Sequence, residues 1–225
     1  MKGWKWILLI GVLCLTGALF LLLRPAKDDP TPTTAAPPAS QQEVTAPQEV
    51  DGLPVGKWVI TPERKAYTDQ ALTLHLPAIQ VTRPVYNGTD SAALRKGVGL
   101  YDYAQLPGQG NRNVSLAAHR NGLDAKGAVT DHAPFYYIDQ LKEGDYLYLS
   151  DSQQIYCYRY DSTWVVEPDD WNPIATTGFS CLTLTSCTPI GVSDHRIVVR
   201  GVLDQIIEYT SDFTFPAQGP EEEAS

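Results

Sequence analysis

A cysteine and an arginine nine residues apart, Cys187 and Arg196, are well suited to covalent chemistry. The thiolate is the nucleophilic form of cysteine, and a nearby positive charge favours that form. Arginine stays protonated and can donate hydrogen bonds to a developing oxyanion. A histidine far upstream, His119, completes a Cys–His combination of the kind found in cysteine proteases and transpeptidases. Together, the three residues predict nucleophilic acyl transfer.

Two strands are expected to bring the cysteine and the arginine together. Residues 182–186 alternate in the period of a buried strand, which should end at Cys187 because the Thr-Pro pair that follows interrupts a ladder. A second apolar strand begins at Arg196. Cys187 and Arg196 should therefore face each other at one rim of a sheet. Arg200 shares the strand face of Arg196 and is the alternative if Arg196 points elsewhere.

A third short buried strand is expected within residues 114–122, where it delivers His119 just before a glycine turn. The other three histidines are predicted to have no part in the site. His75 alternates to the polar side of a strand and is expected to be solvated. His132 lies at a turn, and His195 should point away from the arginine that follows it.

The segments around these residues resemble the sortase family, the cell-wall transpeptidases of Gram-positive bacteria. Residues 183–187, Thr-Leu-Thr-Ser-Cys, are similar to the family's Thr-Leu-x-Thr-Cys signature, and Arg196 stands at the expected position after it. Residues 117–120 are similar to the Ala-Gly-His-Arg element, with Ala118 in place of the glycine. The resemblance covers about residues 72–209 and includes three further segments, at 76–79, 84–88 and 141–145.

The resemblance implies how the site would work. Cys187 would attack a peptide carbonyl to form a thioacyl intermediate, His119 would move protons, and Arg196 would stabilise the oxyanion. Thr185 and Ser186 would contact a sorting signal of the Leu-Pro-x-Thr-Gly type. The acyl group would pass to an amine of a lipid-linked cell-wall precursor or to a pilin lysine. The run after the cysteine suggests class C or class D, but the lid triplet of pilin-type members is missing, so the subclass stays open.

The pattern along the chain predicts a mostly β domain over residues 72–215, with about eight strands and little helix. A closed or nearly closed β-barrel removes exposed strand edges and fits this count, and the resemblance implies the same fold. Residues 146–149 and 155–160 predict a hairpin, and residues 164–166 a separate strand. Residues 134–141 carry apolar side chains at helical spacing.

Other segments flank this domain. Residues 1–24 are mostly apolar after two early lysines and predict an uncleaved transmembrane anchor, favoured over a signal peptide, with the rest of the chain outside the cell. Residues 25–50 are rich in Pro, Thr and Ala and predict a tether. Residues 51–71 are ambiguous, with a short helix expected after Thr61 as N-cap. Residues 216–225 form an acidic tail.

Composition excludes some functions. A formal net charge of −9 argues against nucleic-acid binding. No closely spaced Cys or His ligands suggest a metal site, and no cofactor is expected. Cys157 and Cys181 are either a disulfide across neighbouring strands or core thiols. Two alternatives remain beside the transpeptidase: a secreted cysteine hydrolase, and a tethered β-domain that only binds.

Overall fold

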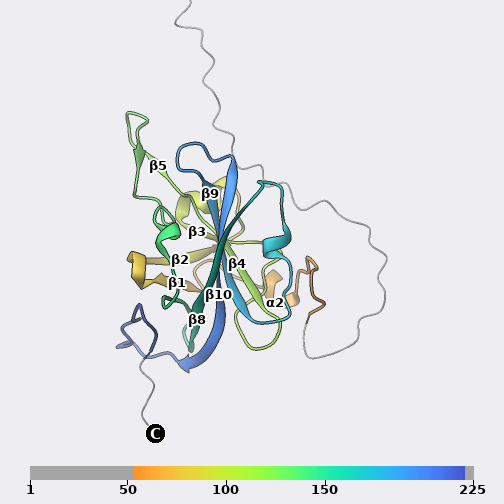
Figure 1. Cartoon of the computed structure of the whole chain (residues 1–225). Helices are drawn as coiled ribbons and strands as arrows, with labels where there is room; N and C mark the ends of the chain where they lie inside the picture. Colours follow the sequence, from red (N-terminus) through yellow and green to blue (C-terminus); the bar gives the residue numbers. More distant parts are fainter. Residues whose placement is uncertain (1–52, 221–225) are drawn as a thin grey trace, which may run out of the picture. The chain divides into compact units, whose positions relative to one another are not determined.

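Ten β-strands are the main regular elements of the part of the chain that the computed structural model describes, residues 53–220 (Figure 1). The strands are β1 Thr73–Leu76, β2 Val81–Asn87, β3 Val98–Leu100, β4 Asn113–Ala117, β5 Gly122–Leu123, β6 Val129–Thr130, β7 Tyr146–Ser150, β8 Gln154–Val166, β9 Cys181–Thr188 and β10 His195–Glu208. The helical segments are α2 Pro62–Lys65, α3 Ser91–Lys96 and the 3₁₀ turns η1 Pro77–Ile79, η2 Ile138–Gln140 and η3 Asn172–Ile174.

Eight of these strands close into a barrel in the order β1-β2-β3-β4-β9-β10-β8-β7. This confirms the predicted eight-stranded, mostly β architecture. The strands β5 and β6 form a separate hairpin, which projects from the top of the barrel in Figure 1. The predicted membrane anchor and tether lie outside the described residues. Within residues 53–220, no helix has the length and apolar character needed to cross a bilayer.

Most neighbouring strands are antiparallel, but β4 and β9 run parallel, as do β2 and β3. Alternate residues of each strand point into the barrel, where Leu74, Leu116, Leu182 and Leu184 are fully buried. The next residues along β4 and β9 therefore point to the outer face. This alternation decides which side chains can form a site on the outside of the barrel.

Two predicted elements differ from the structure. Residues 164–166 do not form a separate strand, because β8 continues to Val166 and pairs with β10 from end to end, with two register shifts on the way. Residues 134–141 form turns and the short η2 in place of a longer helix. Phe135 and Ile138 are both fully buried in the barrel core. A single tight turn is enough to bury this pair, so the helical spacing did not produce a helix.

The prediction that His75 is solvated was wrong. Its side chain is only 9% exposed, its ring stacks on Phe215 at 3.7 Å, and Nε2 lies 3.0 Å from the Ser150 hydroxyl. Burial lowers the pKa of His75 to about 4. The chain that follows β10 causes this, because it returns over the outer face of β1 and β7. Its Phe213 and Phe215 pack against Tyr148.

The N-terminal extension packs against the barrel. The predicted cap and short helix are present: the Thr61 hydroxyl accepts a hydrogen bond from the Arg64 amide, and α2 ends at Lys65. Arg64 is 3% exposed, and its guanidinium donates to the carbonyls of Leu100 and Tyr101 and to the side chain of Asn87. The extension therefore supports the loop that follows β3.

Candidate active site

The cysteine and the arginine predicted to act together are direct neighbours across a strand pair. Arg196 is the partner of Cys187 in the antiparallel ladder of β9 and β10. Directly opposite residues point to the same face of a sheet. Since Leu182 and Leu184 point into the barrel, Cys187 points to the outer face, and Arg196 does so beside it.

The predicted histidine lies on the other side of the same strand. β4 pairs in parallel with β9, and the last printed pair is Ala117 with Thr185. The Ala118 amide still donates to the Thr185 carbonyl at 3.3 Å. Continuing this register by two residues places His119 level with Cys187 and on the same face. Because neighbouring strands are about 4.8 Å apart, the cysteine lies between the histidine and the arginine.

Cys187 differs from the other two cysteines of the described region. All three are free thiols, so Cys157 and Cys181 do not form the disulfide considered from the sequence. Both are fully buried, and burial raises their pKa, to about 12 for Cys157. Cys187 is partly exposed. Among these thiols, Cys187 is thus the one that a substrate can reach.

The two arginines of β10 have different surroundings. The Arg196 guanidinium donates to the backbone carbonyls of Ser193 and His195 at 3.2 and 2.9 Å. Arg200 is turned toward the connection before β9, donates to Pro173 O at 2.8 Å and lies over the Trp164 ring. The strand pairing therefore favours Arg196 over Arg200 as the cation beside the thiol.

His119 follows the end of β4 and is half-buried. Burial lowers its pKa below the usual value, and the positive charge of Arg95 lowers it further. Its backbone carbonyl accepts a hydrogen bond from the Phe135 amide at 3.1 Å. The next residue, Arg120, is buried, donates to Tyr136 O and pairs with Asp139 at 2.9 Å. These contacts fix the backbone on which the imidazole is carried.

The other three histidines lie elsewhere. His195 is held between Asp194 and Glu167 at 2.8 and 3.5 Å, and its pKa is raised mainly by the hydrogen bond to Asp194. The side chain of His132 is 88% exposed. His75 is buried under the C-terminal segment, as described above.

The two hydroxyls predicted to contact substrate are buried and bonded within the protein. Ser186 is 4% exposed and donates to Ala118 O at 2.7 Å, which ties β9 to the residue before His119. Thr185 is 6% exposed and lies 2.8 Å from the hydroxyl of Tyr101. Contact of either residue with substrate stays a prediction. In this structure both hold the ends of the strands in place.

Tyr101 was not identified from the sequence. Burial raises the pKa of its hydroxyl, and Arg196 and Cys187 are both close enough to influence it. Its backbone carbonyl accepts a hydrogen bond from the Arg64 guanidinium. No motif marks this residue in the sequence, because it follows the three-residue strand β3 in a stretch without clear periodicity.

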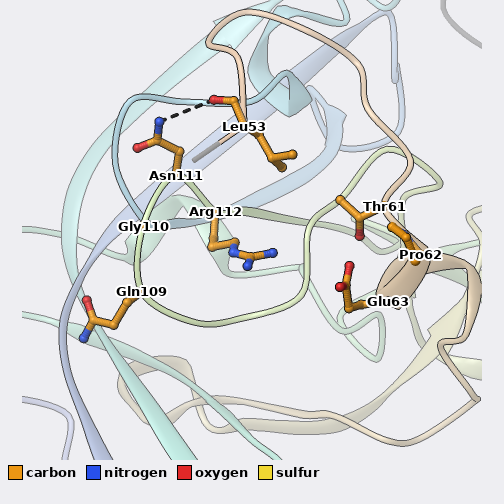
Figure 2. A pocket seen from close by; sticks show the side chains of 8 residues that line it. All are labelled: Leu53, Thr61, Pro62, Glu63, Gln109, Gly110, Asn111 and Arg112. Atoms are coloured by element: carbon orange, nitrogen blue, oxygen red, sulfur yellow. Dashed lines mark hydrogen bonds between the residues drawn. The ribbon is translucent and has the colours of Figure 1, made fainter. Parts of the chain in front are cut away.

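Two of the cavities on the described surface lie at opposite ends of β9. One, of about 510 Å³, is bordered by His119, Arg95 and the β5–β6 hairpin. The other, of about 590 Å³, lies between the N-terminal extension and residues 109–112, where Arg112 and Glu63 point into it (Figure 2). The second cavity is near Cys181, at the opposite end of β9 from Cys187. Over residues 53–220, no cluster of three or more His, Cys, Asp or Glu could hold a metal ion.

Comparison with known proteins matches the chain to one family. A family model described as Sortase domain matches residues 74–204. Sortase A of Bacillus anthracis is 29% identical over 130 residues, which are 58% of this chain and 58% of that protein. Sortase SrtE2 of Streptomyces coelicolor is 31% identical over 163 residues, which are 64% of this chain and 60% of that protein. The chain thus spans about three fifths of the length of these relatives.

Solved structures give the same result for the fold. Sortase C-3 of Streptococcus pneumoniae superposes with a TM-score of 0.58 at 26% identity, covering 72% of this chain and 76% of that one. A lid mutant of sortase A from Corynebacterium diphtheriae has a TM-score of 0.55 at 27% identity, covering 64% and 74%. The matches carry class A, C, D and E names, so they do not assign a subclass.

Proposed function

The chain belongs to the sortase family, and we propose that it is a membrane-anchored cysteine transpeptidase that acts outside the cell. In this proposal it cleaves a sorting signal of the Leu-Pro-x-Thr-Gly type and transfers the acyl group to an amine. The donor is a surface protein or a pilin. The acceptor is a lipid-linked cell-wall precursor or a pilin lysine.

The proposal rests on one observation above all. Cys187 lies on the middle strand of three neighbours, with Arg196 opposite it on β10 and His119 level with it beyond β4. Nucleophile, proton carrier and fixed cation thus come from three strands of one barrel and share one face. Strand positions are more precise than loop positions, which suits chemistry that depends on alignment within a fraction of an ångström.

Acylation is the first half of the proposed reaction. The Cys187 sulfur attacks the carbonyl carbon of the scissile bond, and the Arg196 guanidinium donates to the oxygen as negative charge develops there. His119 takes up the proton of the Cys187 thiol and gives it to the departing amine, the carbon–nitrogen bond breaks, and a thioester remains. In the second half an incoming amine attacks the thioester, loses a proton to His119 and displaces the thiolate.

The second candidate is a cysteine hydrolase, in which water resolves the thioester. The depressed pKa of His119 is compatible with both outcomes, because a neutral imidazole can deprotonate either water or an amine. Exposed apolar side chains flank the site on the β5–β6 hairpin and the β9–β10 turn, namely Leu123, Val129 and Val192. They suit a peptide donor in either case, so the fate of the thioester is what separates the two candidates.

Capture of the thioester tests the proposal. The protein is incubated with a library of sorting-signal peptides, and mass spectrometry identifies any acyl group on Cys187. We expect an adduct that disappears when an amine is added, together with a ligated product. An adduct that gives only free acid in the presence of amine would indicate the hydrolase. Failure of every peptide and of thiol-directed analogues to label Cys187 would contradict both and favour a domain that only binds.

A further inference from the structure

The cavity beside His119 has a charge pattern that the proposed acylation does not use. Its volume is about 510 Å³, and it is lined by α3, the end of β4 and the β5–β6 hairpin. Cys187 and Arg196 are not among its lining residues. His119 is therefore the residue that this cavity shares with the proposed catalytic group.

Three cations line this cavity: Arg83, Arg95 and Lys96. One carboxylate, that of Asp124, lines it as well, and its Oδ1 accepts hydrogen bonds from the backbone amides of residues 126 and 128. The chain as a whole carries a formal charge of −9. A local excess of positive charge on an acidic protein favours an anionic ligand.

The three cations differ in the ion pairs and hydrogen bonds that they make within the protein. Lys96 pairs with Asp69 at 3.3 Å and lies over the Tyr86 ring. Arg83 donates to the carbonyl of its neighbour at 3.0 Å. Arg95 is exposed and makes no hydrogen bond or ion pair with any described residue, so its guanidinium is available for a ligand.

Other acidic groups near α3 do not neutralise Arg95 through a direct contact. Asp90 caps α3 by accepting from the Ala92 and Ala93 amides, and Asp131 interacts with Tyr137 and His132. None of these acids lines the cavity. The positive charge of Arg95 acts electrostatically on His119 and contributes to the low pKa of that imidazole.

We propose that this cavity receives the acceptor amine, and that Arg95, assisted by Arg83 and Lys96, binds a carboxylate or phosphate carried by that acceptor. The inference rests on the proposed transpeptidase function and names its second substrate. The amine nitrogen forms a bond to the thioester carbon, and the carbon–sulfur bond breaks. The proton released by the amine passes through His119 to the departing thiolate of Cys187.

The test compares matched acceptors on the full-length protein in detergent, acylated by a Leu-Pro-x-Thr-Gly donor. The acceptors are Gly-Gly-Gln-amide, Gly-Gly-Glu-amide and Gly-Gly-phosphoserine-amide. One charge-assisted hydrogen bond corresponds to about a tenfold change in kcat/KM. We expect the anionic acceptors to exceed the glutamine peptide by about that factor. Whichever anion is preferred distinguishes a carboxylate source from a phosphate source.

Arg95→Gln should reduce the preference, measured as a ratio within one variant, to about twofold or less. Arg159→Gln removes the same charge from a residue that does not line the cavity, and should keep the wild-type ratio. Equal use of all three acceptors, or a preference that survives Arg95→Gln, would overturn the inference while acylation still supports the proposed function.

A binding measurement keeps the test independent of the donor. Gly-Gly-Glu-amide is titrated into the Cys187→Ala protein, and the NMR signals of the His119 imidazole are followed. We expect shifts that saturate with the glutamate peptide and are at least severalfold weaker with the glutamine peptide. Absence of any difference between the two peptides would overturn the inference even if no donor peptide acylates the enzyme.

Discussion

Cys187 and Arg196 are paired residues of one antiparallel ladder, each on the strand that neighbours the other. Their separation is therefore set by backbone hydrogen bonds, which leave less freedom than two loops would.

Replacing Cys187 by alanine should abolish thioester formation and leave the fold intact, because the side chain is partly exposed and contributes little packing. Mass spectrometry with a sorting-signal peptide measures the first effect, and circular dichroism the second. Cys181→Ala is the matched control: it removes a buried thiol at the other end of the same strand and should keep the adduct. Persistent acyl transfer by Cys187→Ala would contradict the assignment of the nucleophile.

Replacing Arg196 by alanine should lower kcat/KM by about 10²–10³, the usual effect of removing an oxyanion donor. Arg196→Lys should also lose activity, since lysine lacks the planar guanidinium. Arg200→Lys is the comparison, because that residue lies over Trp164 and donates to Pro173 instead. Steady-state kcat/KM values of the Arg196 and Arg200 variants are compared with that of the wild type. Nearly full activity of Arg196→Lys would show that the planar group is not required.

Replacing His119 by alanine should lower the rate by about 10²–10⁴. The pH profile gives a finer test. Because burial and Arg95 lower the pKa of His119, the neutral base persists below pH 6.5. Aminolysis of the isolated thioacyl enzyme should therefore lose half its rate at a pH below 6.5, and Arg95→Gln should move that midpoint upward. An unchanged midpoint in the variant would argue against coupling between the two residues.

Stability should fall at acid pH because of His75. Its pKa is about 4 in the folded protein and about 6.5 in an unfolded chain. Between these values the unfolded chain binds the additional proton, so the stabilisation is complete above pH 6.5 and is lost as pH falls toward 4. Chemical denaturation should show a loss of about 2 kcal/mol over that window. His75→Gln should flatten this dependence, whereas the exposed control His132→Gln should not.

Removing residues 1–50 should leave a soluble, active domain, whereas removing residues 1–66 should not. The difference is Arg64, whose loss would leave the carbonyls of Leu100 and Tyr101 without their donor. Arg64→Ala alone should cost about 2–4 kcal/mol of unfolding free energy. The exposed neighbour Lys65 provides the control, since Lys65→Ala should stay within about 0.5 kcal/mol. Protease protection on intact cells checks the proposed outside location of the domain.

Much of the barrel could be predicted from sequence because strand periodicity is local. The alternation that buried Leu74 and Leu182 was sufficient to place both on inner faces. The Thr61 cap was predictable for the same reason, since the capping contact spans three residues. The site residues could be named because they stand next to strand ends in segments that resemble family motifs.

The remaining features depend on contacts between distant parts of the chain. His75 lies on the polar side of its strand, and only the return of Phe215 over that face makes it buried. Arg64 has the composition of a surface residue, but it is enclosed by the loop that carries Tyr101. Arg95 borders the site because α3 lies near the end of β4. No local sequence pattern predicts any of these three contacts between distant segments.

The parallel pairing of β4 with β9 has a consequence for the order in which activity can arise. Residues 113–117 meet residues 181–185 across more than sixty intervening residues, and the opposite edge of β9 is then covered by β10, which extends to Glu208. Long-range pairing of this kind is slow to form because it must close a large loop first. During synthesis, His119 emerges well before Cys187, and Arg196 last of the three. The thiol consequently lacks its arginine neighbour until β10 has paired with β9, so the three side chains come together only after all three strands have folded.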